Sequence, residues 1–380
     1  MKRYAFGLFL LCTILFACAV PAQALTFEEG TIKSAVLIEV ETGQVLFQYN
    51  AHEALAPAST TKILTALLTL ENVEDLSATV TLPDDFANVG ESGIMLEPGE
   101  TLTYEDLLYA LMLSSANDAA QALAIGVAGS EEAFAEMMNA RTAELGLSDS
   151  SWENPHGLDG PTHLASAYDL AMITREAMKY DMFNTLCSTV SYTIERTKDG
   201  VTTERVLYNH NQFLDRYDGA DGVKTGYTSQ SGSCLVGSAT VNGLRLIGVV
   251  LNADDHYEKM AQLMDYGFGR YQALELGKQG DIVGQVRVIS GDIDLVDVVL
   301  GDDISIPIEL GSDYVPEAVY DYPLALDAPF DVSEPVGTVS YADRLGNVVK
   351  TDLYLARGAE RYTFGTVLQE VWQRFLAVFL

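Results

Sequence analysis

The order of hydrophobic patterns along the chain limits its possible folds most strongly. Two β-rich runs, SCLVGSATV and LRLIGVVLN, flank Asn242-Gly243, a dipeptide that favours the tight turn of a β-hairpin. An earlier pair of runs, AVLIEV and VLFQY, flanks a turn at Thr42-Gly43. Segments with the three-to-four-residue apolar spacing of helices lie between the hairpins. Strands, helices, strands and a final helix therefore predict an α+β domain, in which helices cover an antiparallel sheet.

Helix start signals and apolar stripes predict the helices of this domain. The predicted starts are at Ser59, Thr103, Asp118, Ser130 and Ser166, and a last helix is expected from about Asp255 to Leu274.

A different pattern begins near Gly277. The stretch ISIPIEL alternates apolar and polar residues, Gly and Pro recur, and no helix signal returns before about Tyr362. We therefore predict an α+β domain over residues 25–276, a small all-β domain over 277–360 and a C-terminal helix over 361–380.

The N-terminus has the pattern of a secretory signal peptide. The charged start MKR precedes an apolar core over residues 5–20 and the small-residue cleavage site AQA, which ends at Ala24. We expect residues 1–24 to be removed on export. A permanent membrane helix and a lipoprotein signal with lipid on Cys18 remain alternatives.

Charge and cysteine content exclude several functions. The formal net charge of -32 repels nucleic acid and anionic lipid, and no basic patch offsets it. After removal of the signal peptide two cysteines remain, Cys187 and Cys234, too few for a disulfide framework. Whether these two pair or stay as buried thiols is left open.

A lysine occupies an unusual position in the helix that begins at Ser59. Lys62 lies in the first turn, where the positive end of the helix disfavours a cation, and shares a helix face with Ser59. Burial and the helix dipole both lower the pKa of a lysine, and a neutral lysine can take the proton of a serine nucleophile. The alternative for an isolated motif is a capping serine with a solvent-directed lysine.

Two further triplets follow this motif. Ser115-Ala116-Asn117 lies at a break between two helices, and Lys224-Thr225-Gly226 lies on a strand; each triplet pattern occurs once. With the first motif they match, in order, the S-x-x-K, S-D-N and K-T-G set of class A β-lactamases and penicillin-binding proteins. The combined match favours a catalytic function over chance.

Longer stretches around these motifs resemble D-alanyl-D-alanine carboxypeptidases, the low-molecular-mass penicillin-binding proteins. The stretches are SSANDAAQALA, NPHGLDGPTHLASAYDLA and DGVKTGYTSQSGSCLVGSA. The resemblance spans nearly the whole chain and implies a serine β-lactamase/DD-peptidase-like fold for the first domain. It implies removal of the terminal D-alanine from peptidoglycan pentapeptide stems, covalent binding of β-lactam antibiotics, and no cofactor or metal.

The resemblance also implies catalytic roles for matching residues. Ser59 would be the acylated nucleophile, Lys62 its base, and Ser115 a relay of the proton to the leaving amine. The backbone N–H groups of Ser59 and Tyr227 would form the oxyanion hole.

Four more positions would bind substrate. Asn117 would hold a peptide amide, Lys224 and Thr225 would face the terminal carboxylate, and Gly226 would let the substrate lie along its strand. Ala116 departs from the family pattern, in which Gly is common, but its side chain is small.

Three other functions are weighed against this one. A β-lactamase would use a loop glutamate to activate water, and NPHGLDGPTH offers no clear glutamate motif. A DD-endopeptidase of the same fold would usually lack the β domain. A non-enzymatic wall-binding protein would be free to lose one of the motif residues.

The remaining polar candidates receive structural interpretations. Scattered histidines argue against a metal site, and His156 is expected to order its loop. Asn209 and Asn211 are expected in turns beneath the site, and Asp118 at a helix start.

The C-terminal sequence predicts an amphipathic helix. Its apolar residues recur at steps of three and four: Phe364, Val367, Leu368, Val371, Trp372, Phe375, Leu376, Phe379 and Leu380. We expect this helix to bind the outer face of the cytoplasmic membrane without spanning it. Packing against the protein itself or a partner is the alternative.

Overall fold

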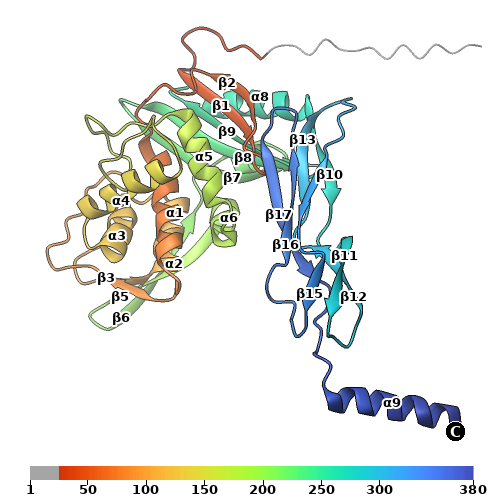
Figure 1. Ribbon diagram of the computed structural model, residues 1–380. Coiled ribbons are helices and arrows are strands. Elements are labelled where there is room, and N and C mark those ends of the chain that lie inside the picture. Colours follow the sequence, from red (N-terminus) through yellow and green to blue (C-terminus); the bar gives the residue numbers. More distant parts are fainter. Residues whose placement is uncertain (1–24, 380) are drawn as a thin grey trace, which may run out of the picture.

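The computed structural model describes residues 25–379, so the expected signal peptide at 1–24 lies outside the described residues. A mixed domain of helices and strands is followed by an elongated domain built from strands (Figure 1). This order agrees with the predicted α+β fold class and its appended β domain.

A five-stranded antiparallel sheet forms the frame of the first domain, with the strand order β2-β1-β9-β8-β7. Its strands are β1 (Ser34–Glu39), β2 (Val45–Tyr49), β7 (Ala220–Thr228), β8 (Gly232–Val241) and β9 (Leu244–Leu251). Both predicted hairpins are confirmed, since β1 pairs with β2 and Val241 pairs with Leu244 across the Asn242-Gly243 turn. Strand β7 forms one edge of the sheet.

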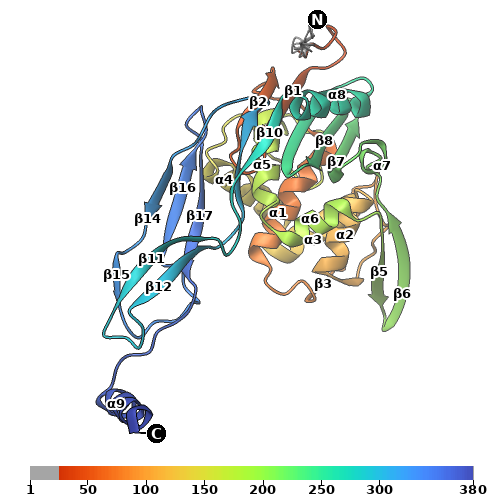
Figure 2. The ribbon, with the colours of Figure 1, turned by 90° about the vertical axis from the view of Figure 1, so that its right-hand side faces the viewer.

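The two faces of this sheet bury separate cores. Successive residues of a strand point to opposite faces. In β1, Val36 and Ile38 therefore join the core made with most of the helices, whereas Ala35 and Leu37 join the core made with α8 (His256–Phe268). Figure 2 shows α8 on one side of the sheet and the helices of the larger core on the opposite side, while Phe213 of the short helix α7 (Phe213–Arg216) packs into the α8 core.

The helices of this domain are α1 (Lys62–Asn72), α2 (Tyr104–Leu113), α3 (Asn117–Ala128), α4 (Glu131–Glu144), α5 (Ala167–Ala177), α6 (Asp181–Ser188), α7 (Phe213–Arg216) and α8 (His256–Phe268). A short 3-10 turn, η1 (Ala58–Thr61), precedes α1, so the predicted helix at Ser59 is a 3-10 turn that continues as an α-helix.

A smaller sheet lies at the lower end of the domain (Figure 1). Its order follows the chain: β3 (Thr79–Thr81), β4 (Thr101–Thr103), β5 (Ser191–Lys198) and β6 (Val201–Tyr208). Arg196 and Arg205 on its long hairpin both donate to the carbonyl oxygen of Ile94, at distances of 3.0 and 2.6 Å, and so hold a loop that runs toward the helices.

The second domain contains β10 (Tyr271–Gly277), β11 (Ile282–Ile289), β12 (Leu295–Leu300), β13 (Ile304–Glu309), β14 (Ala318–Asp321), β15 (Ala325–Asp327), β16 (Gly337–Ala342) and β17 (Val348–Leu355). Six of these strands form a sheet in the order β14-β16-β17-β12-β11-β15, and β10 pairs with β13. The sheets enclose their own core around Val286, Val298 and Leu353.

One predicted boundary is wrong. Helix α8 ends at Phe268 rather than near Leu274, and the residues beyond it form β10. Leu274 pairs with Ile306 of β13, so backbone hydrogen bonds to a strand much later in the chain determine this structure. The apolar pattern around Leu274 fits either a helix or a strand, and it contains no information about the pairing with β13.

Helix α9 (Phe364–Phe379) stands apart from both domains in both views (Figures 1 and 2). Leu368, Val371, Trp372 and Phe375 are more than half exposed. No helix within residues 25–379 combines the length and apolar character needed to cross a membrane.

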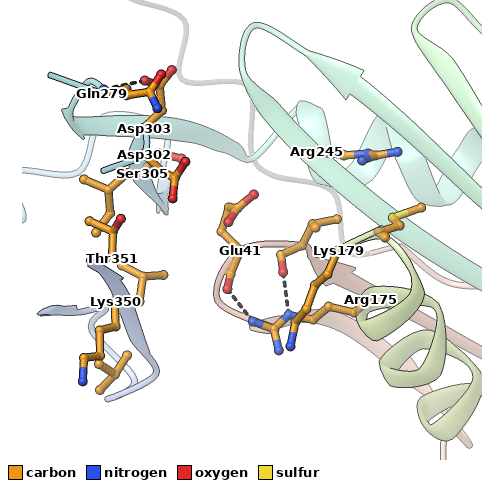
Figure 3. Close-up of a pocket in the computed structure, with 15 residues that line it drawn as sticks. Glu41, Arg175, Lys179, Arg245, Gln279, Asp302, Asp303, Ser305, Lys350 and Thr351 are labelled. Carbon is orange, nitrogen blue, oxygen red and sulfur yellow. Dashed lines mark hydrogen bonds between the residues drawn. The ribbon is translucent and has the colours of Figure 1, made fainter. Parts of the chain in front are cut away.

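A cavity of about 790 Å³ lies between the two domains (Figure 3). The first domain contributes Arg175, Lys179 and Arg245 to its walls, and the second contributes Asp302 and Asp303. None of the predicted site residues lines this cavity, and all of them lie in the first domain.

A pair of glycines sets the distance between α8 and the sheet. Gly248 and Gly237 are opposite each other on β9 and β8, and a Cβ added at Gly248 would lie 2.6 Å from Met260 Sδ of α8. Gly248→Ala should therefore destabilise the protein by about 1–3 kcal/mol through overpacking. Met260→Ala alone should cost about 2–5 kcal/mol through a cavity.

The double variant should lose less stability than the sum of the two single variants, because the shortened residue 260 makes room for the new methyl group. Urea unfolding of the four proteins measures this coupling. Strict additivity would contradict the packing described for α8.

Candidate active site

Ser59 and Lys62 lie on one face at the start of α1. Lys62 Nζ is 3.0 Å from Ser59 Oγ, and the lysine side chain is fully buried. Two further contacts hold the amine: Nζ donates to Asn117 Oδ1 at 2.8 Å and to the carbonyl oxygen of His156 at 2.5 Å. Both of these oxygens can only accept, whereas the serine hydroxyl can also donate. A neutral Lys62 therefore donates its two N–H groups to Asn117 and His156, and its lone pair faces Ser59.

The surroundings of Lys62 favour that neutral form. Burial lowers the pKa of the Lys62 amine well below its usual value, and the nearby charge of Lys224 lowers it further. The carboxylates of Asp118 and Glu91 oppose this shift to a smaller extent. Lys62 is thus buried beside Ser59, which is the environment in which a lysine can act as a base.

The second triplet lies at the break between α2 and α3. Ser115 is buried and has a positive φ of 55°, which is a strained conformation for a serine. Its hydroxyl has no hydrogen-bond partner among the described residues. Asn117 is the first residue of α3, and its side chain links Lys62 to the carbonyl oxygen of Gly90.

The third triplet lies on β7, at the edge of the main sheet (Figure 2). A Cβ added at Gly226 would lie 3.0 Å from the backbone nitrogen of Ser59, so only glycine lets β7 approach η1 this closely. Lys224 is buried, which lowers its pKa to about 7, and Tyr227 is largely exposed. The fold thus brings the three triplets together, as the sequence predicted.

A second glycine permits another segment to approach the same turn closely. Gly157 has a φ of 91°, and a Cβ added there would overlap the carbonyl oxygen of Ala58. The loop that contains His156 is therefore packed directly against the turn that carries Ser59.

Asp118 has a larger structural role than the sequence indicated. Its carboxylate accepts hydrogen bonds from the backbone N–H groups of Ile94 and Leu96 and from Asn88 Nδ2. It therefore fastens the loop at residues 88–96 to the start of α3. The sequence carried no signal for these contacts, since they join a side chain to the backbone of a distant irregular segment.

The two histidines of NPHGLDGPTH order their surroundings. His156 Nδ1 accepts from the backbone N–H of Leu158, which agrees with the predicted loop-ordering role. His163 Nδ1 accepts from the N–H of Glu153, so its Nε2 carries the proton and donates to Thr61 Oγ1 at 2.9 Å. Within residues 25–379 no group of three potential protein ligands could hold a metal ion.

The structure also places the turn asparagines and the two cysteines. Asn209 and Asn211 accept backbone hydrogen bonds within their turn, as predicted. Cys187 and Cys234 are buried free thiols, which settles the alternative left open by the sequence. Burial raises the pKa of Cys234 to about 11, so this thiol stays protonated at neutral pH.

Comparisons with known proteins agree with this geometry. The family described as D-alanyl-D-alanine carboxypeptidase matches residues 21–255, and the penicillin-binding protein 5 C-terminal domain matches residues 271–361. D-alanyl-D-alanine carboxypeptidase DacF of Bacillus subtilis is 38% identical over 288 residues, covering 74% of this chain and 73% of that protein. DacC of Escherichia coli is 30% identical and covers 95% and 93% of the two chains.

Solved structures give the same result. The crystal structure of penicillin binding protein 5 from Haemophilus influenzae matches with a TM-score of 0.63 and 27% identity, over 89% of this chain and all of that one. A peptidoglycan synthesis regulatory factor from Streptococcus pneumoniae matches with a TM-score of 0.69 and 29% identity, over 87% and 99% of the chains. This chain therefore belongs to the D-alanyl-D-alanine carboxypeptidase family of penicillin-binding proteins and is a serine hydrolase of that class.

Proposed function

We propose that this protein removes the terminal D-alanine from peptidoglycan pentapeptide stems through an acyl-enzyme on Ser59. One observation carries the assignment of the nucleophile: the buried Lys62 amine lies 3.0 Å from Ser59 Oγ, with its other contacts made to pure acceptors. A serine needs an adjacent base to become nucleophilic, and among the described residues no other basic side chain is hydrogen-bonded to Ser59.

In the acylation step, Ser59 Oγ attacks the carbonyl carbon of the penultimate D-alanine while Lys62 Nζ takes its proton. The oxyanion is stabilised by the backbone N–H groups of Ser59 and Tyr227. The C–N bond then breaks, and the leaving amine of D-alanine receives a proton through Ser115. Water hydrolyses the ester in the second half of the reaction, with Lys62 again removing the proton. No cofactor or metal takes part.

Substrate binding is assigned to the groups around the nucleophile. Lys224 and Thr225 would bind the terminal carboxylate, and Gly226 leaves room for the substrate along the free edge of β7. One N–H of the Asn117 side chain is bonded to Gly90, so its second N–H remains to donate to a substrate peptide carbonyl. A β-lactam would acylate Ser59 in place of the peptide.

The β-lactamase alternative receives less support. Such an enzyme needs a glutamate that activates the deacylating water. Within the described part of the chain, no carboxylate is hydrogen-bonded to Ser59 or Lys62. The match of the second domain to penicillin-binding protein 5 also favours a carboxypeptidase over an endopeptidase of the same fold.

We place the enzyme outside the cytoplasm, on the outer face of the cytoplasmic membrane. The signal-like start of the sequence supports export, and the exposed apolar side chains of α9 support attachment through that helix. Anchoring would come mainly from apolar burial, because the protein surface is strongly acidic.

Ser59→Ala should abolish both D-alanine release and labelling by fluorescent penicillin, with thermal stability retained. Lys62→Arg should lose acylation almost as fully, because arginine keeps its charge and cannot act as a base near neutral pH. Labelling rates and single-turnover D-alanine release measure both effects. Normal acylation by the arginine variant would show that Lys62 acts only through its charge.

Two lysines should affect the pH dependence of kcat/KM in opposite directions. Lys62 must be neutral to accept a proton, so activity is lost as pH falls through its lowered pKa. Lys224 must be charged to bind a carboxylate, so activity is also lost as pH rises through about 7. Lys224→Arg should remove only the loss at high pH, since arginine stays protonated. An unchanged high-pH limb in that variant would exclude Lys224 as its source.

A chain that ends at Arg361 should be released from membranes and remain active on small peptides. Trp372→Glu combined with Phe375→Glu should have the same effect, because both exposed side chains lie in the apolar stripe. Gln369→Glu with Gln373→Glu adds the same charge to the polar positions and serves as the matched control. Fractionation at low and high salt measures attachment, and retention of the Trp372 and Phe375 variant would contradict the anchoring role.

A further inference from the structure

The loop at residues 88–96 is fixed to the start of α3 at several points. Besides the bonds from Asn88, Ile94 and Leu96 to the Asp118 carboxylate, the backbone N–H of Val89 donates to Gln121 at 3.1 Å. The loop therefore has a definite position beside Asn117, although it contains no helix or strand.

Glu91 lies between the two loop residues whose backbone carbonyl oxygens accept hydrogen bonds from Asn117. The carbonyl oxygen of Gly90 accepts from Asn117 Nδ2 at 3.0 Å, and the carbonyl oxygen of Ser92 accepts from the Asn117 backbone N–H at 2.8 Å. Glu91 is thus held on both sides by one residue of the candidate site. Its φ of 59° is a conformation that costs energy for a non-glycine residue and that recurs at functional sites.

The Glu91 side chain is exposed and free to meet a ligand. It has neither a hydrogen bond nor an ion pair among the described residues. Its negative charge nevertheless acts on the site, since it raises the pKa of Lys62 and of His156 against the effect of burial. A carboxylate that is solvent-exposed, close to the catalytic lysine and without a cation of its own can attract a cationic group of the substrate.

We propose that Glu91 is a specificity-determining residue that recognises a positively charged side chain at the third position of the stem peptide. The inference rests on the proposed function, in which Asn117 holds the peptide amide preceding the penultimate D-alanine. The third residue contributes the carbonyl of that amide, so its side chain lies beside Asn117, within reach of the loop. Its amine, as in lysine or another diamino acid, would face the Glu91 carboxylate.

The test compares two pentapeptides that differ in one charge. One carries lysine at the third position and the other carries Nε-acetyl-lysine, and D-alanine release gives kcat/KM for each. The unmodified enzyme should prefer the free amine by about 3- to 10-fold, as expected for one partly exposed ion pair, and the preference should shrink at high salt. Glu91→Gln should reduce the ratio to near one.

Two further variants sharpen the test. Glu91→Asn also removes the charge but tolerates the left-handed backbone conformation, so agreement between it and Glu91→Gln excludes a distorted loop as the cause. Glu74→Gln removes one exposed negative charge at the far end of α1, and it should keep the full preference.

The outcomes separate the two proposals. If the unmodified enzyme releases D-alanine equally well from both peptides, or if Glu91→Gln retains the preference, Glu91 does not set specificity while the proposed function stands. If neither peptide loses D-alanine, the proposed function itself fails. A preference lost equally in the Glu74 control would trace it to overall charge and overturn the assignment to Glu91.

Discussion

The rest of the site depends on the burial of one amine. Lys62 Nζ is excluded from solvent and contacts the 3-10 turn, the start of α3 and the loop around His156. A buried ammonium is costly unless it is paired, and the three contacts are to neutral oxygens rather than carboxylates. The protein thus gains a base from an unfavourable environment, and each segment that touches the amine is held where the proposed reaction requires it.

Close backbone approach is the second condition for this arrangement. Gly226 lets the edge strand β7 lie against η1, and Gly157 lets the His156 loop lie against the same turn. The main sheet holds β7 in place, because the two faces of the sheet are buried in two hydrophobic cores. A rigid sheet edge beside a strained turn is suited to binding an extended peptide next to the nucleophile.

The family relationship accounts for the fold and the chemistry, whereas the structure shows the environment of individual residues. Membership follows from the matches over both domains, and it accounts for the fold and the class of chemistry. Ala116, which departs from the family pattern, is fully buried and acts as the residue before α3 without a side-chain cap. The cavity between the domains contains none of the candidate site residues, and both of its walls carry acidic and basic side chains.

The sequence by itself determined the features that depend on neighbours in the chain. The Asn242-Gly243 turn specified a hairpin, capping residues specified helix starts, and the spacing of Ser59 and Lys62 placed both on one face. The three triplets, together with the family resemblance, were sufficient to predict the residues that the fold brings together. The tertiary structure decided what depends on distant partners: β10 is a strand because β13 pairs with it. The 88–96 loop has its position because Asp118 binds its backbone, and Cys187 and Cys234 stay apart. Periodicity and turn chemistry act over a few residues, whereas these contacts form only after the chain has folded.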